Sequence, residues 1–238
     1  MKKILLTSLV ASAFALSAQA ADANALVTHT EMGYIQTDGN TKTKTFNLDA
    51  KAKKAWDKHV GTLKIDGQYA QNDDIETKNK YIIEANYDYM ISTKFSFNYL
   101  AGYKSDRYAG FAYQTYTGPG AKYQAVKTDN HNLSVDGNIL YSSDKSYVTK
   151  DTNNYSSYRV QAIYAWQIVE NLKFSQEASL RGSFENTDNY FAYSKTALTS
   201  KISDIFSAGV SYKVDYVNKP LAPKNTDSTL TFNLIMDY

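Results

Sequence analysis

The chain alternates apolar and polar side chains along most of its length, and the pattern is clearest in its last ten residues. One face of an extended segment there carries Leu230, Phe232, Leu234, Met236 and Tyr238. Successive side chains of a strand point to opposite faces, so Thr231, Asn233 and Asp237 share the other face. One face suits lipid and the other suits water, which is typical of the closing strand of an outer-membrane barrel.

The same alternation recurs throughout the chain and predicts an all-β fold. Beyond residue 20, no stretch is long and apolar enough for a membrane-spanning helix, and no helical period persists. The pattern predicts about twelve strands, an even number as in bacterial single-chain barrels. They are expected near residues 26–36, 46–53, 63–69, 81–89, 95–103, 111–123, 133–141, 158–166, 173–181, 190–202, 206–216 and 229–238.

The lengths of the connections support a transmembrane antiparallel up-and-down β-barrel with both termini in the periplasm. Compact inner turns are expected near residues 56–58, 91–93, 127–129, 169–171 and 203–204. The longest connections, residues 142–155 and 218–226, both fall on the opposite, outer side. Outer-membrane barrels show this asymmetry of short periplasmic turns and longer external loops.

The N-terminus has the features of an export signal. Lys2 and Lys3 precede an apolar run over residues 4–16, and Ala18-Gln19-Ala20 forms a small-residue cleavage site. A membrane anchor is the alternative, but this run is shorter than the ~20 residues of a bilayer span. We expect a cleaved signal peptide at residues 1–20, a single barrel domain at residues 21–238, and export to the bacterial outer membrane of a Gram-negative envelope.

Composition narrows the function classes. Basic and acidic residues balance once Lys2 and Lys3 are removed, which argues against a nucleic-acid partner. The chain has no cysteine and 21 tyrosines, and tyrosine suits the interface between membrane and water. A soluble lipocalin-like barrel or β-sandwich also alternates, but it packs its apolar face inside. The many charges on the polar face and the terminal pattern favour the membrane barrel.

Two short motifs resemble a known family. Glu31-Met32-Gly33-Tyr34, followed by Asp38-Gly39-Asn40-Thr41, resembles the opening motif of the salt-induced outer-membrane protein family, a domain of unknown function. Gly118-Pro119-Gly120 with Tyr123 is similar to that family's glycine-rich strand. The resemblance covers residues 26–238. It implies an outer-membrane barrel linked to salt or osmotic conditions, and no substrate, catalytic residue or cofactor.

Few residues suggest catalysis or metal binding. A hydrolase needs a nucleophile beside a positioned histidine, but no nucleophile motif accompanies His29, His59 or His131. Asp73-Asp74 and Glu76 lack the spacing of a calcium loop and are interpreted as a solvated loop tip. We expect no enzyme activity, no metal and no cofactor. Gly118-Pro119-Gly120 predicts a kink or bulge in the wall near Pro119.

The function is expected to depend on charges that face the lumen. Strand parity also places Glu31, Asp49 and Asp237 inside. The candidate lumen-lining residues are Lys51, Lys53, Lys64, Asp66, Glu84, Asp88, Lys122, Asp136, Arg159, Lys173, Glu177, Arg181, Lys195, Lys213 and Asp215.

Neither sign dominates this set, so it suits a narrow channel for ions or small solutes, or a closed structural or adhesive barrel. An outer-membrane hydrolase is a remote alternative. Expected partners are outer-membrane lipid, the barrel assembly machinery during insertion, and small solutes or ions.

Overall fold

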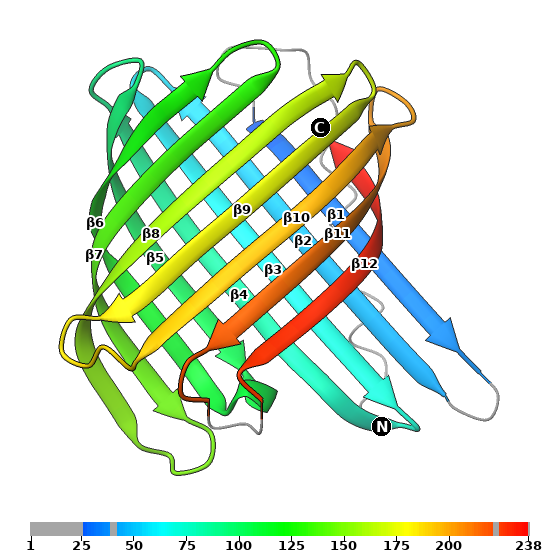
Figure 1. The fold of residues 1–238 in the computed structure, drawn as a ribbon, viewed down its shortest axis with the longest axis vertical. Coiled ribbons are helices and arrows are strands. Elements are labelled where there is room, and N and C mark those ends of the chain that lie inside the picture. Colours follow the sequence, from blue (N-terminus) through cyan, green and yellow to red (C-terminus); the bar gives the residue numbers. More distant parts are fainter. Residues whose placement is uncertain (1–25, 39–41, 221–223, 238) are drawn as a thin grey trace.

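The protein is a closed antiparallel β-barrel of twelve strands (Figure 1). The computed structural model describes residues 26–38, 42–220 and 224–237. Each strand pairs with its sequence neighbours, and β1 pairs with β12 to close the wall. The strands are β1 (Leu26–Thr37), β2 (Thr43–Trp56), β3 (His59–Asn72), β4 (Ile75–Met90), β5 (Phe95–Asp106), β6 (Phe111–Lys127), β7 (His131–Ser146), β8 (Thr152–Val169), β9 (Leu172–Ser183), β10 (Tyr190–Lys201), β11 (Phe206–Val217) and β12 (Thr226–Asp237). The predicted fold class and strand number are therefore confirmed.

The predicted signal peptide, its cleavage site and the terminal Tyr238 lie outside the described residues. Within the described part, no helix combines the length and the apolar character needed to cross a membrane. A single turn of 3-10 helix, Arg107–Ala109, follows β5.

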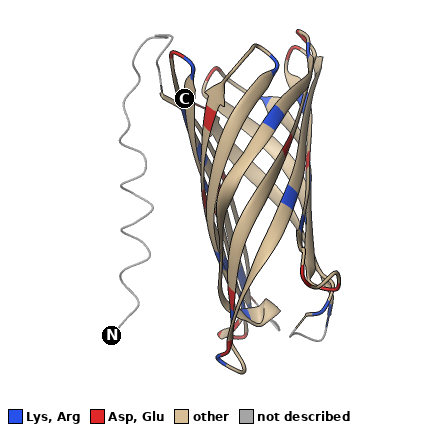
Figure 2. Ribbon diagram, turned by 90° about the vertical axis from the view of Figure 1, so that its left-hand side faces the viewer, with Lys and Arg blue, Asp and Glu red and all other residues tan. Residues whose placement is uncertain are grey.

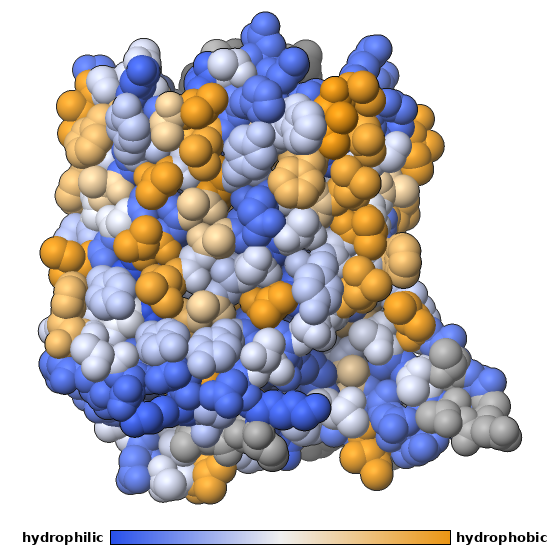
Figure 3. Space-filling view, viewed as in Figure 1, coloured by the Kyte–Doolittle hydropathy of each residue, from blue (hydrophilic) through white to orange (hydrophobic). Residues whose placement is uncertain are grey.

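The alternation seen in the sequence becomes an inside-out barrel. In β12, Phe232 is 69% exposed and Leu234 57%, whereas the intervening Asn233 is 8% exposed. Figure 3 shows apolar side chains spread over the outward face and a hydrophilic belt at the lower end of the view. Charged positions recur along the strands as well as in the connections (Figure 2). The soluble alternative is wrong, because its apolar residues would lie inside.

The two ends of the barrel differ as predicted. Residues 57–58, 91–94, 128–130, 170–171 and 202–205 form turns at one end, called here the turn end. The other end, called the loop end, carries the connections 38–42, 73–74, 107–110, 147–151, 184–189 and 218–225.

One predicted loop is wrong. Most of residues 142–155 is strand, and the connection between β7 and β8 is only residues 147–151. Ser142 pairs with Tyr155, and Asp144 pairs with Asn153. The segment has few apolar residues, but its alternation continues, because Ser142 and Asp144 point inward and are buried. Polar strands thus extend the wall beyond its apolar part.

The predicted bulge near Pro119 is also absent. Strand β6 runs unbroken, and the pairs Thr117 with Tyr141 and Gly120 with Asn138 keep one register across Pro119. The register shifts of β6 against β7 lie near its two ends instead. The glycines permit close approach of backbones: a Cβ on Gly118 would lie 2.0 Å from the carbonyl oxygen of Ile139.

Candidate functional site in the lumen

Three cavities follow one another along the barrel axis. The turn-end cavity, about 210 Å³, is lined among others by Glu31, Asp49 and Lys122. The central cavity, about 90 Å³, includes Gln114 and Tyr116 in its wall. The loop-end cavity, about 250 Å³, is lined by residues such as Lys78, Asp106 and Asp227. Neighbouring cavities share lining residues, so side chains alone separate them.

The first separation is a layer of four charged residues, the Lys64 layer: Lys64, Glu84, Arg159 and Glu177. All four line both the turn-end and the central cavity. Lys64 Nζ of β3 lies 2.9 Å from Glu177 Oε1 of β9, and these strands stand opposite each other in the ring. Arg159 Nη1 lies 3.6 Å from Glu84 Oε1, and the Tyr116 hydroxyl also donates to Glu84. Ion pairs therefore cross the lumen at mid-height.

The second separation is the Asp215 layer, made of Lys80, Lys104 and Asp215. Lys80 Nζ lies 2.6 Å from Asp215 Oδ2, and Lys104 Nζ lies 3.7 Å from Asp215 Oδ1. Lys104 and Asp215 line both the central and the loop-end cavity. Since β5 and β11 are also opposite strands, this layer too spans the lumen.

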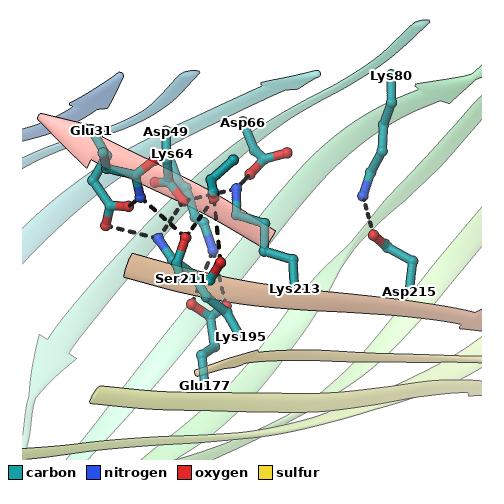
Figure 4. Close-up of polar contacts among 12 residues, drawn as sticks. Glu31, Asp49, Lys64, Asp66, Lys80, Glu177, Lys195, Ser211, Lys213 and Asp215 are labelled. Carbon is teal, nitrogen blue, oxygen red and sulfur yellow. Dashed lines mark hydrogen bonds and ion pairs between the residues drawn. The ribbon is translucent and has the colours of Figure 1, made fainter. Parts of the chain in front are cut away.

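A third cluster of charges lies against the part of the wall that runs from β10 through β11, β12, β1 and β2 to β3. Lys195 Nζ bonds Glu31 Oε1 at 2.8 Å and Asp49 Oδ2 at 2.9 Å. Lys213 Nζ lies 3.4 Å from Asp49 Oδ2 and also bonds Asp66. Figure 4 shows the side chains of this cluster beside Lys64 and Glu177, with the pair of Lys80 and Asp215 further along the barrel.

Arg181 is held by both polar and aromatic contacts. Its Nη1 donates to Ser142 Oγ at 3.1 Å and lies 3.7 Å from Asp144 Oδ1. Its guanidinium carbon lies 4.8 Å from the ring centre of Tyr116 and 4.5 Å from that of Phe191. This stacking fixes the arginine at the wall of the central cavity.

The remaining predicted residues lie toward the turn end. Lys122 Nζ lies 3.6 Å from Asp88 Oδ2, and Asp136 and Lys51 line the turn-end cavity. Lys53 and Lys173 are exposed and, like Lys51, form no ion pair within the described part of the chain. Their positive charges are thus added to the mouth of the barrel at that end.

Sequence reasoning missed several lumen residues. Lys80 and Lys104 lie next to Tyr81 and Tyr103, which the predicted strands place on the outer face. Because side chains alternate between the two faces of a strand, the same pattern would have placed both lysines inside. Asp144 and Tyr155 were missed because their segment was interpreted as a loop. Gln114 was also passed over, because a single uncharged amide carries no signal of its own.

The three histidines have structural partners. His29 bonds Asp237 Oδ1 at 2.5 Å and Glu31 Oε1 at 3.0 Å inside the turn end. His59 and His131 bond the hydroxyl groups of Tyr87 and Tyr164. His59 also stacks with Trp56, and His131 with Trp166. Aromatic clusters of this kind are typical of the interface between membrane and water.

The acidic loop tip forms a tight turn. Asp73 and Asp74 have positive φ angles of 48° and 62°, and Asp73 Oδ1 accepts a hydrogen bond from the backbone nitrogen of Lys42. Among the described residues, no group of three or more histidine, cysteine or acidic side chains is arranged to hold a metal ion.

A closed wall with apolar side chains outside and charges inside makes this protein an outer-membrane β-barrel. The fold resembles the solved structure of the NanC porin, with a TM-score of 0.52 and 11% identity, over 90% of this chain and 99% of that chain. The family model described as "Protein of unknown function, DUF481" matches residues 30–238, so the chain belongs to this family.

A curated relative is also of unknown function. The uncharacterized protein YdiY of Escherichia coli (strain K12) is 26% identical over 209 residues, which cover 85% of this chain and 79% of that protein. Neither the family description nor this relative's name includes salt. The link to salt that the sequence resemblance implies therefore remains a prediction.

Proposed function

We propose that this protein is a narrow channel for small solutes across the outer membrane, with the turn end in the periplasm. The proposal rests on the three cavities that follow one another along the barrel axis. The central cavity shares charged lining residues with each of the other two. The turn-end and central cavities are lined by strand residues only. Only flexible side chains separate the cavities, and side chains can move on the timescale of passage.

The size of the barrel is consistent with this function. Barrels of about eight strands have filled interiors, whereas those of about sixteen leave an open aqueous channel. Twelve strands are intermediate, and here the interior is divided rather than filled. The side chains of Lys64 and Glu177 are 21% and 17% exposed, so their ion pair is in contact with water-accessible space.

The proposed link to salt follows from the same layers. The partners of the Lys64 layer are partly exposed, so salt ions that enter the cavities compete for their charges, although less effectively than at the surface. The Lys64 layer should therefore open more often at high salt. Conductance should then rise more steeply than the conductivity of the bathing solution.

The test is conductance of the purified protein in planar lipid bilayers. Wild type should give small discrete steps, and K64A/E177A should give larger ones because the bridge across the lumen is removed. The matched control is K201A/D204A, which removes an exposed ion pair of the same 2.9 Å length in the turn between β10 and β11. Silence of both wild type and K64A/E177A at all salt concentrations overturns the channel.

A closed structural or adhesive barrel is the second candidate, because ion pairs spanning opposite walls also stabilise a lumen that never opens. Silence in the bilayer would favour it. A hydrolase gains no support, since the side-chain bonds of the three histidine rings go to carboxylates and tyrosine hydroxyls rather than to a serine.

A further inference from the structure

Each of the three cavities is lined by equal numbers of basic and acidic side chains. The central cavity is lined by four basic and four acidic side chains. The turn-end cavity, leaving His29 aside, has five of each, and the loop-end cavity has three of each. A channel selective for ions of one charge instead concentrates the opposite sign at its constriction. None of the three cavities therefore concentrates charge of one sign, although lysines without an ion pair among the described residues add positive charge at the turn-end mouth.

This balance disfavours a solute that carries a net charge. Such a solute entering the Lys64 layer would leave one partner of a partly buried ion pair without its counter-charge. The same solute would also lie close to a like charge, and charges interact more strongly in this confined space than in bulk water. An uncharged polar solute can exchange hydrogen bonds with both members of a pair and leave the pair intact.

The central cavity also contains an amide without partners. Gln114 of β6 lines this cavity and is 0% exposed. Neither its amide oxygen nor its amide nitrogen hydrogen-bonds to any described residue. A buried amide left unpaired costs free energy, so the side chain is suited to a group that donates and accepts together. A hydroxyl group does both.

The rest of the wall suits the carbon skeleton of such a solute. Tyr116, Phe191 and Tyr193 contribute aromatic rings to the same cavity. Sites for small organic molecules combine such apolar surface with a few directed polar groups. We propose that the central cavity is a binding site for an uncharged polyhydroxylated solute, a small polyol or sugar, on its way through the barrel. This inference rests on the proposed channel function and names its solute class.

The experiment is swelling of proteoliposomes in glycerol, arabinose, glucose or sucrose, compared with lysine hydrochloride and sodium glutamate, whose organic ions carry a net charge of either sign. We expect wild type to pass glycerol and arabinose several-fold faster than lysine or glutamate, with rates that fall as the sugar grows. Arabinose should also reduce the ion current in planar bilayers, because it occupies the central cavity. In Q114M the concentration of arabinose that halves the current should rise about tenfold, the value of one good hydrogen bond.

The matched control is Q68M. Gln68 is an inward glutamine of β3, 5% exposed, that lines none of the three cavities, so its replacement should leave both measurements unchanged. Ion current with no effect of any polyol, or faster passage of lysine or glutamate, overturns the solute class but keeps the channel. Absence of both current and swelling overturns the channel and this inference with it. The solute comparison on wild type decides the question even if Q114M does not assemble.

Discussion

Replacing Lys195 with methionine tests whether the lumen is a poorly hydrated space. The lysine bonds two carboxylates, Glu31 at 2.8 Å and Asp49 at 2.9 Å, which are 7% and 6% exposed. Methionine has a similar length and no charge, so K195M leaves both carboxylates without their shared cation.

The magnitude follows from burial and from the partners that remain. Removing one member of a buried ion pair costs about 3–5 kcal/mol. Glu31 keeps its bonds to Asn233 Nδ2 at 2.8 Å and to His29 Nε2 at 3.0 Å, and Asp49 keeps Lys213 Nζ at 3.4 Å. We therefore expect K195M to lower the free energy of unfolding by the smaller of these values, about 3 kcal/mol, which is roughly a hundredfold change in the folding equilibrium constant.

The assay is urea unfolding in lipid vesicles at neutral pH, followed by the fluorescence of Trp56 and Trp166, which lie near the turn end of the wall. Ordinary carboxylates take up protons at about pH 4, and a protonated carboxyl no longer needs a cation. Lowering the pH toward about 4 should therefore reduce the difference in unfolding free energy between K195M and wild type. The triple variant K195M/E31Q/D49N, with no charge left unpaired, should regain much of the loss.

The matched control is K201M, since Lys201 forms its ion pair with Asp204 at 2.9 Å in an exposed turn. K201M should have no measurable effect on unfolding. If K195M destabilised the barrel no more than K201M does, the lumen would be as well hydrated as the surface. Charges inside the lumen would then interact no more strongly than exposed ones, which contradicts the electrostatic reason for the exclusion of net-charged solutes.

Two further predictions concern the wall and its orientation. G118A should impair assembly, because its Cβ would lie 2.0 Å from the Ile139 carbonyl oxygen. G67A should be tolerated, since the new Cβ there would lie 4.0 Å from the Cβ of Leu48, an ordinary contact. Heat-modifiable migration in gels distinguishes the folded from the unfolded barrel. The chain has no native cysteine, so V148C, at a position 68% exposed in the loop 147–151, should react with an impermeant maleimide on intact cells. S203C at the turn end should react only after permeabilisation, and the reverse labelling pattern would contradict the proposed orientation.

The predicted strands agree with the structure wherever alternation is strong, and they fail where composition misled. The polar segment from Ser142 to Tyr155 looked like a loop because it has few apolar side chains, yet its backbone pairs in register on both sides of the short connection 147–151. Pro119 looked like an interruption, yet the flanking glycines let the neighbouring backbone come close without a bulge. In both cases pairing between strands overrode the local preference of the residues.

The sequence by itself determined the class of this protein. Side chains alternate between the two faces of a strand, so the order of adjacent residues already decides which of them face lipid and which face the lumen. Only the tertiary structure decided which inward charges meet. Lys64 and Glu177 are 113 positions apart, and their contact depends on closure of the ring and on the stagger of strands, which set the height of each side chain. The same closure placed Gln114 in the central cavity without a partner, which no local pattern in its strand could reveal.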